Sequence, residues 1–384
     1  MSRVLTIKKI DGKPGQVYYP LQLTTHPKPV PGPGEVLVRM RAAALNHRDL
    51  FIRQHLYPGI SFAQPLLADG CGTVVALGPG VPDVSLLPGQ RVLLTPCRGW
   101  ASSPLGPEDP RGFAAVGGVA AALALAPRTG AAQDYAAVPA AELEPCPPHL
   151  SDAEAAALPL AGLTAWRALV TKTRGLGDDG GPLGAGANVL ITGIGGGVAL
   201  AALQFAVARG CAAWVTTSRP EKLARARDEL GARGGASYTD EGWDRALLAQ
   251  LPASRPYFDA IIDGAGGDVM ARAVRLLRPG GAVVCYGMTA GPRMEWGMAA
   301  VMRNLELRGS TMGSRAEFRD MVEFVRRRRI RPVVARAVEG LGDLEAIDGL
   351  FEDMRHGRQF GKLVIMITPQ DEEEEDRPGA DAKL

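Results

Sequence analysis

The sequence is poor in features that would place a protein at a membrane or on nucleic acid. No apolar run approaches the length that spans a bilayer, and the N-terminus, MSRVLTIKKIDGK, is too charged for a signal peptide. The net charge is +2, and no basic stripe carries the interleaved aromatic residues of a nucleic-acid-binding module. We therefore expect a cytoplasmic protein whose partners include neither membrane nor nucleic acid.

Metal-binding patterns are also missing. The five histidines are widely spaced, and the five cysteines never form a CxxC pair. A zinc site needs three or four thiolate or imidazole ligands close together. The sequence therefore predicts no bound metal, and it predicts reduced thiols at the five cysteines, which are Cys71, Cys97, Cys146, Cys211 and Cys285.

Length and composition predict two globular domains. The chain has 384 residues, which is long for one domain, and 46% of them are hydrophobic and 22% charged, as is ordinary for a globular protein. Short strand-like runs at 36–39, 72–77 and 91–95 alternate with Gly/Pro-rich turns, and no helical periodicity is sustained before Asp152. Residues 100–129 form a long Gly/Pro/Ala-rich connection, which is either a partly ordered lobe or a mobile loop.

From Ser151 onward the pattern changes to alternating helices and strands. Ser151 and Glu154 have capping-box spacing, so a helix is expected to begin there. The alternation predicts an α/β fold with a doubly wound parallel sheet, in which ligands bind at the C-terminal ends of the strands. The expected strands are 189–192, 213–217, 260–263, 282–286, 305–310 and a last strand 363–367 that returns to the first domain, and the expected helices are 163–173, 198–209, 221–230, 269–277 and 316–329.

A glycine-rich loop after the first of these strands carries the clearest chemical signal. The loop has one side chain, that of Ile194, and a helix is expected to begin at Val198. Bare backbone can approach a phosphate closely, and a helix N-terminus offers free N–H donors. The loop therefore predicts a dinucleotide site, with a purely structural turn as the alternative, and its glycines are Gly193, Gly195, Gly196 and Gly197.

The residues after the second strand bear on the choice of dinucleotide. NAD sites place an acid about 20 residues beyond the glycine loop, where it binds the ribose 2′-hydroxyl. Here that position is Thr217, followed by Ser218, Arg219 and Lys222, with no acid at the strand end. Arg219 and Lys222 can pair with a 2′-phosphate, although two solvated basic residues are the alternative. The segment predicts NADPH.

Six segments carry a resemblance to a known family over residues 1–368. They are ALNHRD at 44–49, RQHLYP at 53–58, AGLTAW at 161–166, VLITG at 189–193, DGAGG at 263–267 and LLRPGG at 276–281. They resemble the medium-chain dehydrogenase/reductase family, in its zinc-free quinone oxidoreductase and enoyl reductase branch. The resemblance implies a GroES-like β-rich catalytic domain, residues 1–160 completed by 315–368, and a Rossmann NADP-binding domain, residues 161–314. It also implies a homodimer formed through the edge strand 305–310.

The departures from the zinc-dependent relatives follow from the same comparison. Those relatives have Cys where this chain has Asn46, His where Ala68 aligns beside the matching acid Asp69, and Cys or His at Leu160. Their four-cysteine structural zinc lobe is also missing, since only Cys97 lies near that region. The resemblance therefore implies a zinc-independent enzyme.

The resemblance implies three catalytic residues. Tyr57 matches the tyrosine that donates a proton in the enoyl-thioester reductases of the family, with an ordinary turn tyrosine as the alternative. Asn46 is expected to orient the nicotinamide or ribose, or alternatively to cap a helix. Asp49 is expected to brace the local backbone more than to take part in proton transfer.

Further residues are expected to contact the cofactor. Thr164 resembles the family threonine near the diphosphate or nicotinamide, although it could cap a helix. Lys362 matches a loop that lines the cofactor cleft, with a surface lysine as the alternative. The remaining candidates lie at the ends of predicted strands, and they are Gly264, Gly287, Met288 and Thr289.

Together these features predict an NADPH-dependent oxidoreductase that transfers hydride to an activated C=C bond or a quinone without zinc. One alternative is an alcohol dehydrogenase or aldehyde reductase of the same family. Another is a non-catalytic NADPH-binding protein with a sensor or structural role. The acidic tail, residues 369–384, is expected to be disordered, and its final Ala-Lys-Leu makes a peroxisomal location the alternative to the cytoplasm.

Overall fold

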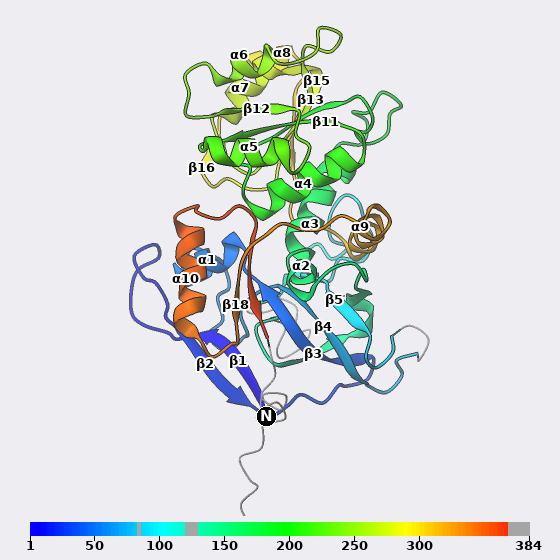
Figure 1. Cartoon of the computed structure of the whole chain (residues 1–384), viewed down its shortest axis with the longest axis vertical. Coiled ribbons are helices and arrows are strands. Elements are labelled where there is room, and N and C mark those ends of the chain that lie inside the picture. Colours follow the sequence, from blue (N-terminus) through cyan, green and yellow to red (C-terminus); the bar gives the residue numbers. More distant parts are fainter. Residues whose placement is uncertain (83–85, 120–129, 368–384) are drawn as a thin grey trace, which may run out of the picture. The chain divides into compact units, whose positions relative to one another are not determined.

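The computed structural model describes residues 1–82, 86–119 and 130–367, and the chain divides into two compact units (Figure 1). Unit 1 is formed by residues 1–160 together with the C-terminal part from Ser314, and unit 2 by residues 161–313. The chain therefore leaves unit 1, builds unit 2 as one uninterrupted segment and then returns. The predicted disordered tail, its terminal Ala-Lys-Leu and residues 120–129 of the long connection lie outside the described residues.

Unit 1 is built on a sheet whose central strand is β3 (Glu35–Ala44). β3 is a mainly apolar run and no residue of it is exposed. It pairs antiparallel with β4 (Asp69–Leu77) and, near its end, with β19 (Lys362–Met366), which confirms that the last strand returns to the first domain. The strand order is β18-β19-β3-β4-β5-β9, and β8 also pairs with β3; these strands are β5 (Arg91–Leu94), β8 (Tyr135–Pro139), β9 (Leu143–Pro145) and β18 (Val334–Glu339).

Two small ribbons and a set of helices complete the described part of unit 1. Helix α2 (Asp152–Ala156) begins with the predicted capping box, because the Ser151 hydroxyl accepts the Glu154 N–H and the Glu154 carboxylate accepts the Ser151 N–H. The ribbons are β1 (Ser2–Ile7) with β2 (Leu21–His26) and β6 (Cys97–Arg98) with β7 (Ala114–Ala115), and the other helices are α1 (His47–Arg53), α9 (Arg315–Arg328) and α10 (Leu344–Arg355).

One helix in unit 1, α1, was not predicted from the sequence, in which no helical periodicity is sustained before Asp152. Helix α1 follows directly on β3 and has only seven residues, about two turns, which is too short for a hydrophobic period to show in the sequence. Its start is nevertheless fixed locally, because the Asp49 carboxylate accepts the backbone N–H of Asn46 at 2.7 Å. A side chain thus satisfies a backbone donor at the helix start.

Unit 2 contains a six-stranded parallel sheet of order β12-β11-β10-β13-β15-β17. This order confirms the predicted doubly wound fold. The chain enters at β10, moves to one edge and then crosses to β13, so the topology reverses beside β10, where such sheets bind ligands. The strands are β10 (Asn188–Ile191), β11 (Ala212–Thr217), β12 (Gly234–Ser237), β13 (Phe258–Asp263), β15 (Leu277–Cys285) and β17 (Glu306–Gly309).

Helices cover this sheet: Figure 1 shows α5 lying across β11 and β12, and α4 packs on β10 and β11. Helices α6 and α7 pack on each other and on β12, β13 and β15. Helix α4 ends as predicted at Gly210, which has φ +83°. The helices are α3 (Pro159–Trp166) with a π-helical continuation 167–171, α4 (Gly197–Ala208), α5 (Pro220–Asp228), α6 (Trp243–Leu248), α7 (Val269–Leu276) and α8 (Met298–Met302), and a small ribbon joins β14 (Gly266–Gly267) to β16 (Gly291–Met294).

One predicted boundary in unit 2 is wrong. Residues Pro279-Gly280-Gly281 were expected to separate a helix from a strand that begins at Ala282, but β15 already begins at Leu277. The register between β13 and β15 is irregular at this point, because Phe258 pairs with Leu277 and Ala260 with Ala282. Such an irregularity lets a strand contain a proline that donates no hydrogen bond.

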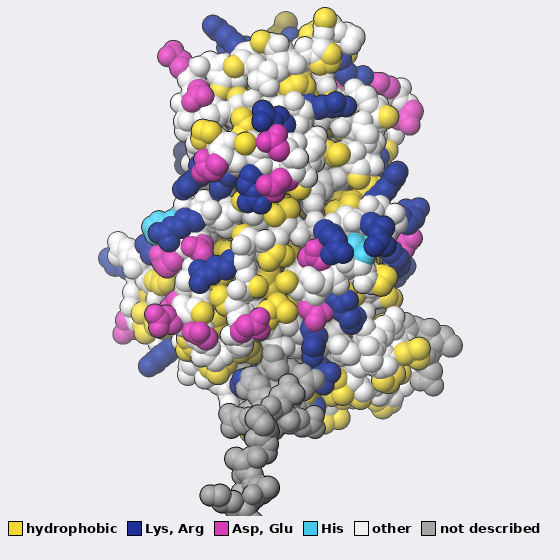
Figure 2. All heavy atoms as spheres, in the orientation of Figure 1, with side chains coloured by type: hydrophobic (Ala, Val, Ile, Leu, Met, Phe, Trp, Pro, Cys, Tyr) yellow, Lys and Arg dark blue, Asp and Glu magenta, His cyan; other side chains and the backbone are white. Residues whose placement is uncertain are grey.

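The described surface carries both signs of charge. Figure 2 shows basic and acidic side chains interspersed over the visible face of both units. Among the described residues, no helix combines the length and the apolar character that a bilayer crossing demands.

Candidate functional site

The glycine loop of unit 2 joins the C-terminal end of β10 to the first turn of α4. Gly193 has φ +67° and Gly195 has φ +121°, values that residues with a side chain rarely adopt. A Cβ at Gly193 would meet no atom within 4 Å, and one at Gly196, the cap of α4, would meet none nearer than 3.9 Å. The loop therefore presents bare backbone beside the free N–H groups of Gly197 and Val198, as phosphate binding requires.

A lysine side chain lies against this loop. A Cβ at Gly195 would be 2.9 Å from Cδ and 3.1 Å from Nζ of Lys222. Lys222 stands in the first turn of α5, so it reaches back from the helix that follows β11. Burial and the neighbouring charge of Arg219 lower the pKa of Lys222. A phosphate bound to the loop would favour the charged form of Lys222 and so raise this pKa again.

The other residues predicted to select the cofactor lie at the end of β11. Thr217 is the last residue of β11, and its hydroxyl accepts the backbone N–H of Arg219 at 3.2 Å. Ser218 is exposed, and the Arg219 guanidinium lies 3.8 Å from the carboxylate of Glu221 on an exposed surface. An exposed pair at this separation is weak. The basic group can therefore turn toward a ligand phosphate.

The candidates at the ends of β13 and β15 form one group. Thr289 donates two hydrogen bonds to the carbonyl of Gly264, from its backbone N–H and from its hydroxyl, each at 3.2 Å. A Cβ at Gly264 would be 2.5 Å from the hydroxyl of Tyr286, so this position accepts only glycine. Gly287 is half-buried and Met288 is exposed. These segments follow the strand ends on the ligand-binding edge of the sheet.

Asp69 is the centre of a buried polar cluster in unit 1. Its Oδ2 accepts hydrogen bonds from Nδ2 of Asn46 at 2.9 Å and from Nζ of Lys362 at 2.8 Å. Its Oδ1 accepts the backbone N–H of Leu160 at 2.7 Å, and Nζ of Lys362 also donates to Oδ1 of Asn46 at 2.6 Å. Asp69 is 0% exposed, Lys362 5% and Asn46 8%. We call these three side chains the Asp69 cluster, in which the buried charges are paired, as burial requires.

The main sheet of unit 1 positions the Asp69 cluster. Asn46 follows β3, Asp69 begins β4 and Lys362 begins β19. Because β3 pairs with both other strands, Ala44 stands opposite Asp69 on one side and Val364 on the other. Three chain segments that are far apart in sequence are thereby brought to one place.

Asp49 adjoins this cluster and is completely buried. Its Oδ2 accepts the Asn46 N–H, while its Oδ1 has no partner in the described part of the chain. Burial raises the pKa of Asp49 to about 6, against the opposing charge of Arg48. The carboxyl group can therefore hold a proton close to neutral pH.

Tyr57 is half-buried and lies beside Arg48. The guanidinium carbon is 4.9 Å from the centroid of the Tyr57 ring, a cation–π contact. The same guanidinium donates to the carbonyls of Val116 at 2.5 Å and Gly117 at 3.0 Å, so it is held in place. The Tyr57 hydroxyl makes no hydrogen bond to any described residue, which leaves it available to a ligand.

Comparison with known proteins identifies the family. The alcohol dehydrogenase GroES-like domain matches residues 32–148, and the zinc-binding dehydrogenase domain matches residues 197–327. The chain is 56% identical over 370 residues to the zinc-type alcohol dehydrogenase-like protein YogA of Leptosphaeria maculans, which covers 96% of this chain and 100% of that protein. The chain belongs to the medium-chain dehydrogenase/reductase family.

Other proteins that this chain resembles carry different activities in their names. An acryloyl-coenzyme A reductase of Metallosphaera sedula is 26% identical, over 88% of this chain and 93% of that protein. The crystal structure of an NAD-dependent alcohol dehydrogenase has a TM-score of 0.79 at 30% identity, covering 96% of this chain and 100% of that one. A crotonyl-CoA carboxylase/reductase in complex with NADP shares the fold, with a TM-score of 0.77 at 22% identity, over 96% and 95% of the two chains. The oxidoreductase class is therefore shared, whereas the substrates differ.

The family description implies a zinc ion, but the residues of this chain do not fit one. The resemblance places Asn46, Ala68 and Leu160 at zinc-ligand positions, where their side chains offer an amide, a methyl group and an apolar group. Asn46 and the backbone of Leu160 donate hydrogen bonds to Asp69, and Ala68 precedes Asp69 in the chain. The ammonium of Lys362 already supplies a positive charge at this place. In residues 1–82, 86–119 and 130–367, no group of three or more His, Cys, Asp or Glu could hold a metal ion.

The structure thus groups some predicted residues and separates others. Asn46 and Lys362 share one buried cluster, although Lys362 was predicted only as a cofactor contact. Thr164 is buried on α3, as part of unit 2. Arg48 was not predicted as a site residue, because nothing in the mixed polar and apolar stretch HRDLFIR, which forms α1, distinguishes it from Arg53. The hydrogen bonds of Asp69, which join distant segments, were also not predicted.

Asp49→Asn is expected to flatten the pH dependence of stability between about pH 4 and about pH 6. The folded-state pKa of about 6 lies above the ordinary value of 3.8, so the folded protein binds more protons in this window and loses stability as the pH rises through it. The raised pKa corresponds to an effect on the order of 3 kcal/mol. Urea unfolding at both ends of the window measures the slope.

Asp240→Asn, at an exposed acid that makes no ion pair among the described residues, is the control and should keep the wild-type slope. If Asp49→Asn also kept the wild-type slope, Asp49 would ionise as an ordinary acid in the folded protein.

Proposed function

We propose that this protein is an NADPH-dependent reductase that transfers hydride to an activated C=C bond or to a quinone without a metal ion. The observation that carries the proposal is the ammonium of Lys362, which lies 2.6 Å from Asn46 and 2.8 Å from Asp69 at the positions aligned with zinc ligands. A metal-free site favours acceptors that conjugation has already activated. An isolated alcohol or aldehyde needs a stronger Lewis acid.

NADPH is supported by the fit of unit 2 to a phosphorylated dinucleotide. The backbone of Gly195 and Gly196 and the first turn of α4 would hold the diphosphate, and Arg219, Ser218 and Lys222 would hold the 2′-phosphate. Thr164, Gly264 and the segment Gly287 to Thr289 remain predicted contacts to the rest of the cofactor. Bound NADPH supplies the hydride for the reaction. The protein's own groups must orient the acceptor and manage charge and protons.

The acceptor needs one proton after the hydride arrives. Tyr57 is the proposed donor, because its hydroxyl has no partner among the described residues and its ring is fixed by Arg48. Hydride addition at the β-carbon moves negative charge to the carbonyl oxygen, and the α-carbon then takes the proton. The product is the saturated carbonyl compound.

Two alternatives have specific support. Relatives named alcohol dehydrogenase, one of them NAD-dependent, favour oxidation of an alcohol or reduction of an aldehyde. A non-catalytic NADPH-binding role would need only the features of unit 2. Both are outcomes of the substrate test below.

A homodimer is also proposed, through the edge strand β17. This strand ends the parallel sheet, and Leu307 on it is partly exposed at 39%. Met298, Val301 and Met302 of the preceding helix α8 are exposed apolar side chains. An exposed strand edge beside apolar side chains is suited to pairing with a second copy.

Arg219→Glu is expected to weaken NADPH binding selectively. The substitution places a negative charge where the 2′-phosphate is proposed to bind, so the dissociation constant for NADPH should rise by roughly tenfold or more, about 1.4 kcal/mol, while that for NADH changes little. Titration of the nicotinamide fluorescence measures both constants.

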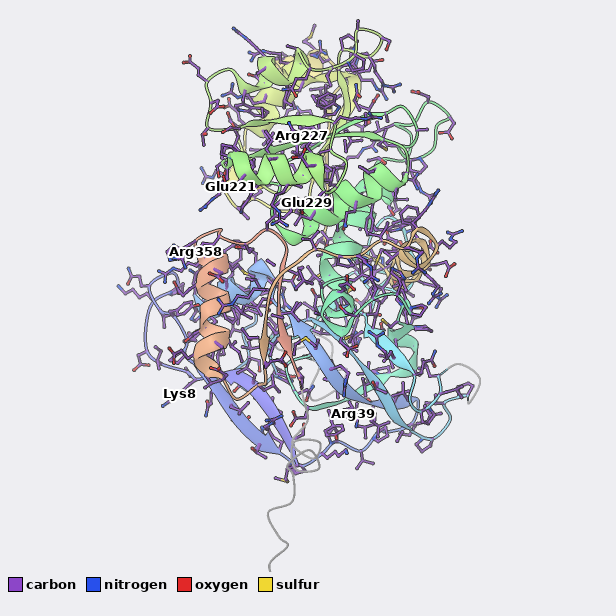
Figure 3. All side chains as sticks on the ribbon, in the orientation of Figure 1. Lys8, Arg39, Glu221, Arg227, Glu229 and Arg358 are labelled. Atoms are coloured by element: carbon purple, nitrogen blue, oxygen red, sulfur yellow. The ribbon has the colours of Figure 1, made fainter. Side chains whose placement is uncertain are left out.

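Arg227→Glu, farther along the exposed face of α5, makes the same charge change away from the glycine loop (Figure 3). It should leave the preference unchanged. Wild-type protein that binds NADPH and NADH equally would contradict the assignment of Arg219 and Lys222.

Purified protein is expected to contain no stoichiometric zinc and to keep its activity in the presence of a strong chelator. The physical reason is that the Asp69 cluster holds an ammonium and no second cation can share the site. Elemental analysis of protein that was never exposed to a chelator gives the zinc content. One zinc per chain, with activity lost on its removal, would favour the alcohol dehydrogenase reading.

The substrate class is tested by following NADPH oxidation with quinones, enones, enoyl thioesters and simple aldehydes. Conjugated acceptors are expected to react, and saturated aldehydes to react at least about a hundredfold more slowly. Tyr57→Phe should lower kcat by roughly ten- to a hundredfold for enones, because one general-acid contribution is lost.

Quinones offer an internal control in the same variant, since a reduced quinone takes its protons on oxygen directly from water. If Tyr57→Phe reduced every enone at the wild-type rate, Tyr57 would not be the proton donor and the proton would come from water. If the protein bound NADPH tightly but no acceptor oxidised the bound NADPH, the result would favour a non-catalytic NADPH-binding role.

A further inference from the structure

The ammonium of Lys362 has one donor to spare. A lysine ammonium carries three N–H groups. Two of them have acceptors, Oδ1 of Asn46 at 2.6 Å and Oδ2 of Asp69 at 2.8 Å, and the described residues provide no third. A buried donor without a partner is costly, so a third N–H calls for a ligand.

Of the two charged residues in the cluster, only Lys362 retains any exposed surface. Asp69 is completely buried, and both of its oxygens accept hydrogen bonds from the protein. Lys362 and Asn46 are 5% and 8% exposed. A ligand that reaches the cluster can therefore contact Lys362 or Asn46, but not the Asp69 carboxylate.

The two hydrogen bonds also hold the ammonium in place. Ordering a free lysine side chain costs conformational entropy. Here the fold already holds the side chain in one conformation, so a ligand that binds does not bear this entropic cost. Asp69 in turn is fixed by the Leu160 N–H at 2.7 Å and by Nδ2 of Asn46 at 2.9 Å. The charge is thus preorganised in surroundings that strengthen its field.

We propose that Lys362 is a catalytic residue whose third N–H donates a hydrogen bond to the carbonyl oxygen of the acceptor, in place of a metal ion. Asn46 and Asp69 are positioning residues that hold the ammonium. This inference rests on the proposed function, and it assigns Lys362 to the acceptor where the sequence assigned it to the cofactor.

The step balances without a change in the protonation of Lys362. The acceptor gains a hydride at its β-carbon from NADPH, which becomes NADP⁺, and the π electrons of its C=C bond move to form the enolate. The enolate oxygen carries the negative charge and accepts the Lys362 N–H. The α-carbon then takes a proton from Tyr57 or water, and the carbonyl forms again.

Absorption spectroscopy tests the contact without turnover. The probe is 4-(dimethylamino)cinnamaldehyde, whose absorption moves to longer wavelength when a positive group polarises its carbonyl oxygen. It is added to the full chain with NADP⁺, which has no hydride to give. The band is expected to move to longer wavelength with wild-type protein and to stay unshifted with Lys362→Met.

Lys8→Met is the matched control. Lys8 is an exposed lysine at the outer edge of unit 1 (Figure 3), so the same loss of an ammonium there should keep the wild-type shift. Because Lys362→Met leaves the buried Asp69 charge unpaired, Asp69→Asn/Lys362→Met serves as a second variant that removes both charges. It should show the same unshifted band.

Kinetics separate this role from cofactor binding. Lys362→Met and the double variant should lower kcat for enones by at least about a hundredfold, with the dissociation constant of NADPH within about threefold of wild type. Lys362→Arg should restore part of kcat, because it returns a donor and a charge.

Two results would overturn the inference. One is an unchanged band shift in folded Lys362→Met, and the other is no shift in wild-type protein that reduces enones. A wild-type shift without turnover of any acceptor would support the contact while the proposed reductase function failed.

Discussion

The ion pair between Asp69 and Lys362 is the constraint on which the candidate site in unit 1 depends. A carboxylate with no exposed surface stays ionised in a protein only if it is paired and hydrogen-bonded. The Asp69 carboxylate accepts hydrogen bonds from Asn46, from Lys362 and from the backbone N–H of Leu160. Removing either charge would leave the other buried and uncompensated. The geometry of the site therefore follows from a requirement of stability.

The candidate site in unit 2 depends on backbone conformation instead of a buried ion pair. Its loop has to bring backbone close to an anion, so glycines with positive φ follow β10 and the charge comes from Lys222 of the next helix. Unit 1 offers a cation held by an acid, whereas unit 2 offers an anion-binding loop with a lysine across it. The first arrangement suits a developing oxyanion, and the second suits a phosphate.

The sequence predicted the parts of this protein that depend on local patterns. The glycine loop, the Ser151 capping box and five of the six strands of the unit 2 sheet follow from spacing within about twenty residues, and the family resemblance supplied the overall fold. Strand β12 was not predicted, because its sequence, GGAS, has no β-branched or aromatic residue. Helix α1 was not predicted, because two turns are too short to show a hydrophobic period in the sequence. The Asp69 cluster was not predicted, because it depends on the pairing of β3 with both β4 and β19. This pairing brings residues 46 and 362 together, although they are far apart in the sequence. Nothing in the spacing of Lys362 distinguishes a buried ion pair from a surface lysine.

The same pairing has a consequence for the order in which the protein forms during synthesis. Unit 2 is one uninterrupted segment, so it can fold as soon as it has left the ribosome. The strand β19, however, is among the last parts of the described chain to emerge, and it brings the partner of an acid made almost three hundred residues earlier. Until then Asp69 has no counterion, and the sheet of unit 1 lacks the strand beside β3. The nascent chain can therefore hold a folded unit 2 before unit 1 is complete, for the time that residues 314–366 take to emerge.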